Sequence, residues 1–172
     1  MSQPPIRILG VDPGLRRTGW GLIDAAGSRL SFVACGCVTS DQQAPIGVRL
    51  RQLHEGLLAV VAAHVPDEAA IEETFVNRDP QSALKLGQAR GAALTALALS
   101  DLDIEDYAAN LVKKTVVGSG HADKAQIGMM VRVLLPASNA ASADAADALA
   151  VAICHAQHRA ARRLERRIAA GG

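Results

Sequence analysis

The chain has 172 residues, about the length of one domain, and 49% of them are hydrophobic while only 2% are aromatic, which excludes a disordered chain and predicts a core of Ala, Leu and Val. No apolar run approaches the ~18 residues that span a bilayer and no secretory signal is recognisable, so we expect a cytoplasmic protein without membrane contact. The net charge of +1 is unevenly distributed: residues 159–167 carry +4 and residues 1–158 carry −3. Binding of a polyanion to the main part of the chain therefore requires local basic patches or bound cations.

The sequence shows no internal repeat and divides only near its end. Residues 1–158 are expected to form one domain, followed by an Arg-rich tail over residues 159–172. This tail is either a disordered phosphate-binding arm or a solvated helix end, and both interpretations stay open. Cys35, Cys37 and Cys154 lack the spacing of a zinc site and are expected to be buried free thiols.

The first part of the chain begins with predicted strands. Residues 6–12 are mostly apolar and β-branched, and the turn sequence DPGLRRTG leads into WGLID, which together predict a hairpin. The segment LSFVACGCV predicts a third strand, antiparallel to the hairpin. Two later segments, EAAIEETF over 68–75 and IEDYA over 104–108, predict a fourth and a fifth strand.

Four segments carry the helical pattern. Apolar residues recur every three or four positions from Val48 to Val65, where Pro66 ends the run. Asp79, or a residue beside it, is placed to cap a second helix, and Ser142 is placed to cap the last one. The predicted helices cover residues 48–65, 80–99, the stretch from the glycine loop GSG to Leu135, and 142–168.

The order of these elements indicates the fold class. Strands that alternate with helices after an antiparallel start are typical of α/β proteins. We therefore predict an α/β fold, with a five-stranded mixed sheet, parallel crossovers and helices on both faces.

Acidic residues lie at the ends of two predicted strands. Asp12 follows an apolar strand and precedes Pro-Gly, and Glu72 takes the corresponding place in the fourth strand, with Glu73 beside it. Open α/β sheets bind ligands at such strand ends, although an Asp-Pro-Gly turn alone also explains Asp12. Because side chains alternate along a strand, only one of the two glutamates points where Asp12 does.

Two further acids, Asp144 and Asp147, lie three residues apart in the last predicted helix and share one face. Alternatively, Asp144 stabilises the helix N-terminus that Ser142 caps, and Asp147 is an ordinary surface acid. Converging carboxylates repel one another unless divalent cations neutralise them. An acidic set with few histidines favours Mg²⁺ or Mn²⁺ over Zn²⁺, and two such ions ~3.5 to 4 Å apart can cleave phosphodiesters.

Five segments occur in order over residues 7 to 155: ILGVDPGLRRTGWG, AIEETF, SALKLGQARG, VKKTVVGSGHADKAQI and DAADALAVAI. Together they resemble the RuvC family of Holliday-junction resolvases. The resemblance implies a ribonuclease-H-like fold, a homodimer and a partner branch-migration complex of the RuvA and RuvB type. It also implies a metal-dependent endonuclease of recombination and repair, which nicks two like-polarity strands of a four-way DNA junction symmetrically and leaves 5′-phosphate and 3′-hydroxyl ends.

The same resemblance assigns the catalytic acids. They fall on Asp12, Glu72, Asp144 and Asp147, which would hold two Mg²⁺ ions, or Mn²⁺ in their place, with Asp12 bridging both ions. Glu73 stands where some relatives carry a neutral amide.

Basic and aromatic residues also receive roles from the resemblance. Lys124 would take part in catalysis and, with Lys113, would contact DNA near the scissile phosphate, whereas a helical lysine is otherwise a solvated surface group. Phe75 would stack on an unpaired base at the junction centre, a contact worth ~1 to 3 kcal/mol, whereas composition alone makes it a core residue. The other basic residues that we expect at the DNA are Arg16, Arg17, Arg78, Lys85 and Arg90.

Alternatives to this assignment stay open. The Ala- and Gly-rich faces of helices 48–65 and 80–99 either form the dimer surface or only cover the sheet. An ATPase or sugar kinase of the actin-like superfamily would need a second domain, and the chain contains no G-x-x-x-x-G-K-[ST] loop. A junction-binding module without catalysis would not need four acids. A ribonuclease-H-like nuclease acting on RNA would share the acids but lack the dimer.

Overall fold

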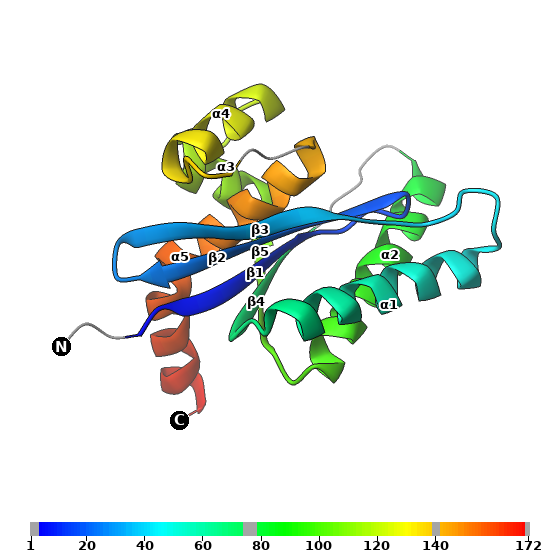
Figure 1. Cartoon of the computed structure of the whole chain (residues 1–172), viewed down its shortest axis with the longest axis horizontal. Helices are drawn as coiled ribbons and strands as arrows, with labels where there is room; N and C mark the ends of the chain where they lie inside the picture. The colour runs from blue at the N-terminus through cyan, green and yellow to red at the C-terminus, as the bar shows by residue number, and fades with distance from the viewer. Residues whose placement is uncertain (1–3, 74–78, 139–141, 171–172) are drawn as a thin grey trace.

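The computed structural model describes residues 4–73, 79–138 and 142–170, which are arranged around a central mixed sheet (Figure 1). The first three strands pair antiparallel, whereas the fourth pairs parallel with both the first and the fifth. The predicted five-stranded mixed sheet with parallel crossovers is therefore confirmed. In spatial order, the strands of this part of the chain are β3 (Arg29–Thr39), β2 (Arg17–Ala26), β1 (Ile6–Asp12), β4 (Glu68–Glu73) and β5 (Asp103–Ala108).

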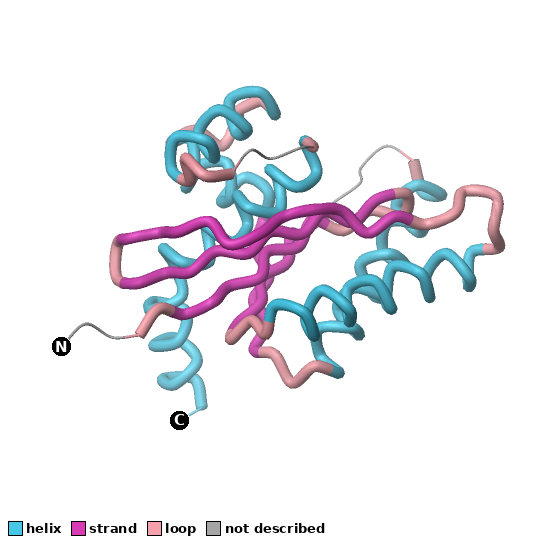
Figure 2. Tube along the Cα trace, in the orientation of Figure 1, coloured by secondary structure: helices cyan, strands magenta, loops and turns pink. Residues whose placement is uncertain are grey.

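Helices cover both faces of the sheet, as predicted (Figure 2). Each face packs its own cluster of buried apolar side chains, one around Leu9 and Leu57 and the other around Ile8 and Leu149. The sheet is therefore buried from both sides at its centre. The first face is covered by α1 (Ile46–His64) and α2 (Pro80–Leu99), and the second by α5 (Ala143–Ala170), against which α3 (Ala109–Val117) and α4 (Lys124–Leu134) pack.

Side-chain caps determine where two of these helices begin. The Asp79 carboxylate accepts hydrogen bonds from the backbone N–H groups of Gln81 and Ser82 at the start of α2. At the start of α5, Ser142 Oγ accepts a hydrogen bond of 3.1 Å from the backbone N–H of Ala145. Both predicted caps are confirmed, and each satisfies donors that a first helical turn leaves without partners.

One helix, α3, was not predicted from the sequence. It follows β5 directly and ends at Gly118, whose φ of 87° is left-handed. Val112 and Val116 are its buried apolar residues. One such pair in a short basic segment is a weak helical pattern, and the helix gains its stability by packing against α4 and α5.

α5 lies very close to the sheet because glycines face it. A Cβ atom added to Gly10 on β1 would lie 2.1 Å from the carbonyl oxygen of Ala148, and one added to Gly19 on β2 would lie 2.1 Å from that of Asp144. Only residues without a side chain permit this approach. It brings the first turns of α5, with Asp144 and Asp147, down to the carboxyl end of β1.

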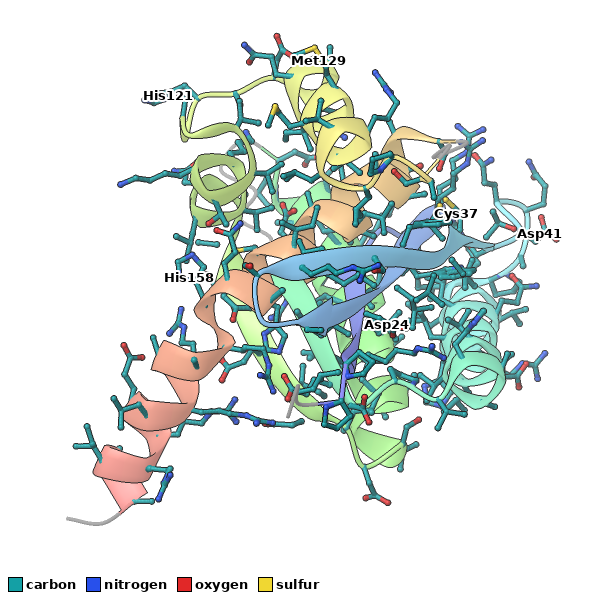
Figure 3. The ribbon with its side chains drawn as sticks, turned by 60° about the vertical axis from the view of Figure 1, so that its left-hand side comes forward. Asp24, Cys37, Asp41, His121, Met129 and His158 are labelled. Carbon is teal, nitrogen blue, oxygen red and sulfur yellow. The ribbon has the colours of Figure 1, made fainter. Side chains whose placement is uncertain are left out.

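The Arg-rich segment continues α5 without a break as far as Ala170, and its last turns extend past the sheet (Figure 3). Arg159 and Arg163 both contact the Glu68 carboxylate, and Arg166 lies 2.7 Å from Asp103 Oδ1. As far as Ala170, the Arg-rich segment is therefore the end of a helix and not a disordered arm, and it forms ion pairs with residues at the starts of β4 and β5. The boundary expected at residue 158 falls inside this helix, and the division into two parts stays a prediction.

The cysteines differ from the expectation. Cys154 is buried, but Cys35 and Cys37 are partly exposed, because they lie on the edge strand β3, none of whose residues is fully buried. The continuation of β4 over residues 74 and 75 lies outside the described residues. No helix in the described ranges is both long and apolar enough to cross a membrane.

Candidate active site

Asp12 and Glu72 end two neighbouring parallel strands and point to the same face of the sheet. Along β1 and β4, Ile8 and Ala70 belong to the core under α5, and both acids lie an even number of positions from them. Because side chains alternate along a strand, both acids face α5, whereas Glu73 is absent from the cavity that they line and reaches only the hollow at the strand ends. The structure therefore selects Glu72 over Glu73 as the partner of Asp12.

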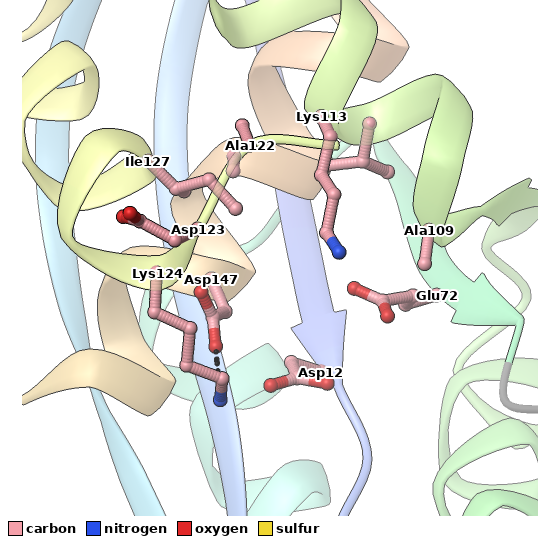
Figure 4. Close-up of a pocket in the computed structure, with 11 residues that line it drawn as sticks. Asp12, Glu72, Ala109, Lys113, Ala122, Asp123, Lys124, Ile127 and Asp147 are labelled. Atoms are coloured by element: carbon pink, nitrogen blue, oxygen red, sulfur yellow. Dashed lines mark hydrogen bonds and ion pairs between the residues drawn. The ribbon is translucent and has the colours of Figure 1, made fainter. Parts of the chain in front are cut away.

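The side chains of Asp12 and Glu72 line a cavity of about 430 Å³ beside α5 (Figure 4). Asp147 reaches it from α5, Lys113 from α3 and Lys124 from the start of α4. Five residues that were predicted for the site, from five different elements, thus meet at one place.

Asp144 lies beside this cavity, not in its wall. It lines an adjoining hollow together with the loop between β1 and β2, and its Oδ2 atom lies 4.0 Å from a guanidinium nitrogen of Arg17. Its charge still acts on Asp12. The structure therefore brings three of the four predicted acids into one cavity and places the fourth next to it.

Asp12 and Glu72 resist ionisation. Burial, followed by the charges of Glu72, Asp147 and Asp144, raises the pKa of Asp12 to about 8, although Lys124 opposes this shift. Burial and the charge of Asp147 raise the pKa of Glu72 to about 7, against the effects of Lys113 and Lys124. Negative charge in the cavity is thus incompletely compensated by the protein, which favours the binding of cations.

Lys124 supplies part of the compensating charge. Its Nζ atom donates a hydrogen bond of 3.0 Å to Asp147 Oδ2, and this bond raises the pKa of the lysine. The residue begins α4, where Asp123 and Gln126 form a reciprocal capping box. The cap fixes the backbone of Lys124, while 71% of its side chain remains exposed and can change partner.

The donors in the cavity suit hard divalent cations. Its described lining residues offer carboxylate oxygens from Asp12, Glu72 and Asp147 and no histidine or cysteine, a set that suits Mg²⁺ or Mn²⁺. The Asp123 carboxylate instead caps α4 and points away from the other acids (Figure 4). Among the described His, Cys, Asp and Glu side chains, no three are close enough to hold one ion by themselves. Mg²⁺ is often held by one or two carboxylates together with water and substrate phosphates, and this open arrangement fits such binding.

The other predicted basic residues lie in different surroundings. Arg16 and Arg17 are exposed and line the hollow beside Asp144. Lys85 is exposed on α2, in a groove with Ile46 and Leu84 on the opposite face of the sheet from α5. Their contacts with DNA stay predictions.

Arg90 does not present a free guanidinium group to solvent. It forms an ion pair with Asp106 and donates a hydrogen bond from Nε to the backbone carbonyl oxygen of Glu72, at 3.4 Å. Phe75 and Arg78 lie outside the described residues, so the stacking and phosphate contacts expected of them stay predictions.

Asn110 is a site residue that the sequence analysis missed. It lies in the first turn of α3 and lines the outer part of the site with Asp12, Glu72 and Glu73. A polar residue just after a buried strand was the signal that found Asp12. That signal is absent at Asn110, because β5 is rich in acidic residues and only its Tyr107 is buried, so the position of Asn110 becomes visible only with α3.

Comparison with known proteins agrees with this geometry. The family model for "Crossover junction endodeoxyribonuclease RuvC" matches residues 8–155. The protein of that name from Methylocella silvestris is 67% identical over 164 residues, which are 95% of this chain and 93% of that protein.

Two solved structures of RuvC from Thermus thermophilus are also similar, each at 31% identity over 90% of this chain. The protein alone has a TM-score of 0.80 over 96% of its chain, and the complex with a Holliday junction substrate has 0.82 over 94%. The expected ribonuclease-H-like fold is therefore confirmed. Because the family model matches residues 8–155 and the relative from Methylocella silvestris is 67% identical over 95% of this chain, the chain belongs to the RuvC family of crossover junction endodeoxyribonucleases.

Proposed function

We propose that this chain cleaves four-way (Holliday) junction DNA as a divalent-metal-dependent endonuclease. Family membership supports the proposal, as does the Thermus thermophilus complex with a Holliday junction substrate. The observation that carries it is the cavity where Asp12, Glu72 and Asp147 meet Lys113 and Lys124. Carboxylates that bind cations beside lysines that attract phosphate are the groups that metal-dependent phosphodiester cleavage needs.

Asp12, Glu72, Asp144 and Asp147 would hold two Mg²⁺ ions, with Mn²⁺ as an alternative. Once bound, Mg²⁺ would supply an activated water molecule and stabilise the leaving oxygen. The charges of the three other acids all raise the pKa of Asp12, which supports its place at the centre of the acidic set that would hold the ions. Asp144, one helical turn before Asp147, would contribute from the side of the adjoining hollow.

Lys113 and Lys124 would bind the scissile phosphate. In the free protein Lys124 is held by Asp147, and its exposed side chain would be able to turn to a phosphate oxygen of bound DNA. Lys113 approaches from α3, on the side of Glu72 (Figure 4). Attack by water on the phosphorus would leave a 5′-phosphate and a 3′-hydroxyl.

The proposal includes a homodimer, because two active sites related by a two-fold axis match the approximate two-fold symmetry of a four-way junction. The exposed face of α2 supports this assembly. Leu84 is 65% exposed there, and Cβ atoms added to Gly87 and Gly91 would meet nothing within 4 Å. These positions leave room for a second backbone to approach closely. A branch-migration partner of the RuvA and RuvB type is proposed from family membership alone.

The function is tested with a synthetic four-way junction, a linear duplex and an RNA:DNA hybrid, each incubated with the protein and Mg²⁺, Mn²⁺ or EDTA. We expect paired symmetric nicks in the junction only, dependent on the metal, and sealable by DNA ligase because ligase requires 5′-phosphate and 3′-hydroxyl ends. Asp12→Asn should reduce nicking at least ~100-fold, since it removes a metal ligand, while junction binding stays within about threefold. Faster cleavage of the hybrid, or undiminished cutting by the variant, would contradict the proposal.

A further inference from the structure

The end of β4 is held by fewer backbone contacts than the rest of the strand. The pairing of β1 with β4 ends at Val11 and Ile71, so the ladder between these two strands does not extend to Asp12 and Glu72. On the other side, β4 stays paired with β5 as far as Glu73. The position of Glu72 relative to Asp12 therefore depends on what holds β4 and β5 from outside the β1–β4 ladder.

Arg90 supplies such a contact from the opposite face of the sheet. It lies on α2, forms an ion pair with Asp106 on β5, and donates a hydrogen bond from Nε to the carbonyl oxygen of Glu72, at 3.4 Å. Asp106 is the register partner of Ile71, the last residue of β4 that pairs with β1. One planar guanidinium group thus ties α2 to both strands at the point where the β1–β4 ladder stops.

The surroundings of Arg90 disfavour a contact with DNA. Its side chain is 24% exposed and already paired with a carboxylate, and it is absent from the described residues that line the acid cavity. A phosphate would have to compete with Asp106 for the guanidinium group. Lys113 and Lys124, by contrast, face the cavity directly.

We propose that Arg90 is a positioning residue: through Asp106 and the carbonyl group of Glu72 it holds the end of β4, so that the Glu72 carboxylate stays beside Asp12 in the wall of the acid cavity. The residue touches neither substrate nor metal and acts through Glu72. This inference rests on the proposed function, because it concerns the same acids, but it predicts a change in metal binding that can be measured without DNA.

The test compares full-length wild-type protein with Arg90→Ala, Arg90→Lys and Asp106→Asn. Binding of Mn²⁺ alone is measured by electron paramagnetic resonance, junction binding in EDTA by a mobility shift, and thermal unfolding by circular dichroism. Arg90→Ala should weaken Mn²⁺ binding about tenfold, a usual effect of losing a group that orients a metal ligand. It should raise the Mg²⁺ concentration for half-maximal cleavage by a similar factor and leave the junction dissociation constant in EDTA within twofold.

Arg90→Lys separates the carbonyl contact from the ion pair. A lysine can pair with Asp106, but it lacks the planar fork that reaches Asp106 and Glu72 together. We expect wild-type thermal stability with Mn²⁺ binding still weakened. Asp106→Asn should also weaken Mn²⁺ binding. The double variant with Arg90→Lys should raise the Mn²⁺ dissociation constant by less than the product of the two single fold-changes, because both substitutions act on one contact. These two variants keep the inference testable if Arg90→Ala does not fold.

A matched control is Arg7→Ala. Arg7 also joins a carboxylate and a backbone carbonyl, pairing with Asp24 at 2.9 Å and donating to the carbonyl oxygen of His64 at 3.1 Å, but it lies at the start of β1. The control should lower the melting temperature and leave Mn²⁺ binding unchanged.

Three results would overturn the inference. If Arg90→Ala lowers the melting temperature like the control but binds Mn²⁺ normally, the ion pair is only structural. If it weakens junction binding in EDTA and reduces the salt dependence of that binding, Arg90 contacts DNA. If Arg90→Lys binds Mn²⁺ like wild type, the carbonyl contact has no role. Should the wild type bind Mn²⁺ but cleave no junction, the proposed function fails while the Mn²⁺ comparison still decides the role of Arg90.

Discussion

At the scale of single residues, the acids of the cavity combine burial with mutual repulsion. Asp12 is the most affected, with a pKa of about 8, because it is buried and three other carboxylates act on it. A buried acid with a raised pKa holds its proton in the folded protein at a pH where the unfolded chain has lost it. In the absence of metal, this arrangement therefore lowers the stability of the fold as the pH rises.

Asp12→Asn should stabilise the metal-free protein, and increasingly so at higher pH. The folded state keeps the Asp12 proton up to about pH 8, whereas the unfolded chain releases it near 3.8, so Asp12 costs the wild type stability between these values. The variant lacks this contribution and keeps only the smaller one of Glu72. We expect a gain of about 1 kcal/mol or more at pH 8, or ~2 to 4 °C in Tm, and none below pH 4. Thermal unfolding in EDTA from pH 4 to pH 9 measures the difference in Tm between variant and wild type. A difference that does not change with pH would rule out the Asp12 proton as the cause of the stabilisation.

At the scale of elements, the site depends on how closely α5 approaches the sheet. The backbone of β1 contacts α5 directly at Gly10, which has no side chain. Gly10 lies two residues before Asp12, and α5 is the helix that carries Asp147. Any added atom at Gly10 would meet backbone atoms of Ala148 and Ala152, which cannot rotate away. Packing and the geometry of the site are therefore determined by the same contact.

Gly10→Ala should impair both stability and metal binding. The new methyl group forces α5 away from β1, and overpacking of this kind costs about 1 to 3 kcal/mol. A displacement near 1 Å between Asp12 and Asp147 can reduce catalysis about 100-fold. Gly47→Ala in α1, where an added Cβ meets nothing within 4 Å, is the control and should change neither property. Denaturant unfolding and junction cleavage measure both effects, and unimpaired cleavage by Gly10→Ala would contradict the dependence on close approach.

The other end of β4 shows a second link to α5. The Glu68 carboxylate accepts a hydrogen bond of 2.8 Å from His155 Nε2 and one of 2.9 Å from Arg159 Nε, and it also contacts Arg163. Burial raises the pKa of Glu68, but these hydrogen bonds and the two arginine charges outweigh it and lower the pKa well below its ordinary value. The ionised carboxylate is therefore the form that anchors α5 to the sheet.

Glu68→Gln should destabilise the protein at neutral pH. An amide leaves buried positive charge unpaired, and we expect a loss of about 2 to 4 kcal/mol in the free energy of unfolding. A carboxylate with a lowered pKa contributes stability that is fully present above its unfolded value of 4.5 and is lost as the pH falls through the folded value. The difference between wild type and variant, measured by urea unfolding, should thus be constant near pH 7 and shrink below pH 4.5. A difference that grows on acidification would exclude this anchor.

At the scale of the whole molecule, charge and symmetry decide how a polyanion is bound. Residues 1–158 carry a net charge of −3, and much of the Arg-rich helix end is engaged in ion pairs with β4 and β5. In the proposed function, attraction of DNA would therefore come from local groups such as Lys113 and Lys124, and from cations that the acids would hold. A two-fold assembly would present two such sites to one junction.

Leu84→Glu should dissociate the proposed homodimer. A carboxylate in an apolar interface costs about 2 to 3 kcal/mol, which raises the dimer dissociation constant about 30- to 150-fold. The control is Met129→Glu, because Met129 is also exposed but lies on α4, on the other side of the sheet (Figure 3). Sedimentation velocity measures the mass, and junction cleavage shows whether the two nicks become uncoordinated. Dissociation by Met129→Glu alone would place the interface on α4.

Local pattern was sufficient for much of the fold. Alternating apolar residues and turn sequences located the strands, and Asp79 and Ser142 marked helix starts, because period and capping depend on residues within one turn of each other. α3 could not be recognised in this way, since its two buried valines become meaningful only against α4 and α5.

By itself, the sequence pointed to the candidate acids, which are carboxylates at two strand ends and on one helix, whereas the candidate lysines were predicted only through the family resemblance. Only the tertiary structure decided that Glu72 and not Glu73 faces Asp12, that Asp144 lies beside the cavity, and that Arg90 is bound to Asp106. The reason is that local sequence determines only on which face of its own helix or strand a residue lies. Distances between elements depend on strand register and on close contacts such as that of Gly10 with α5, which join residues far apart in the sequence.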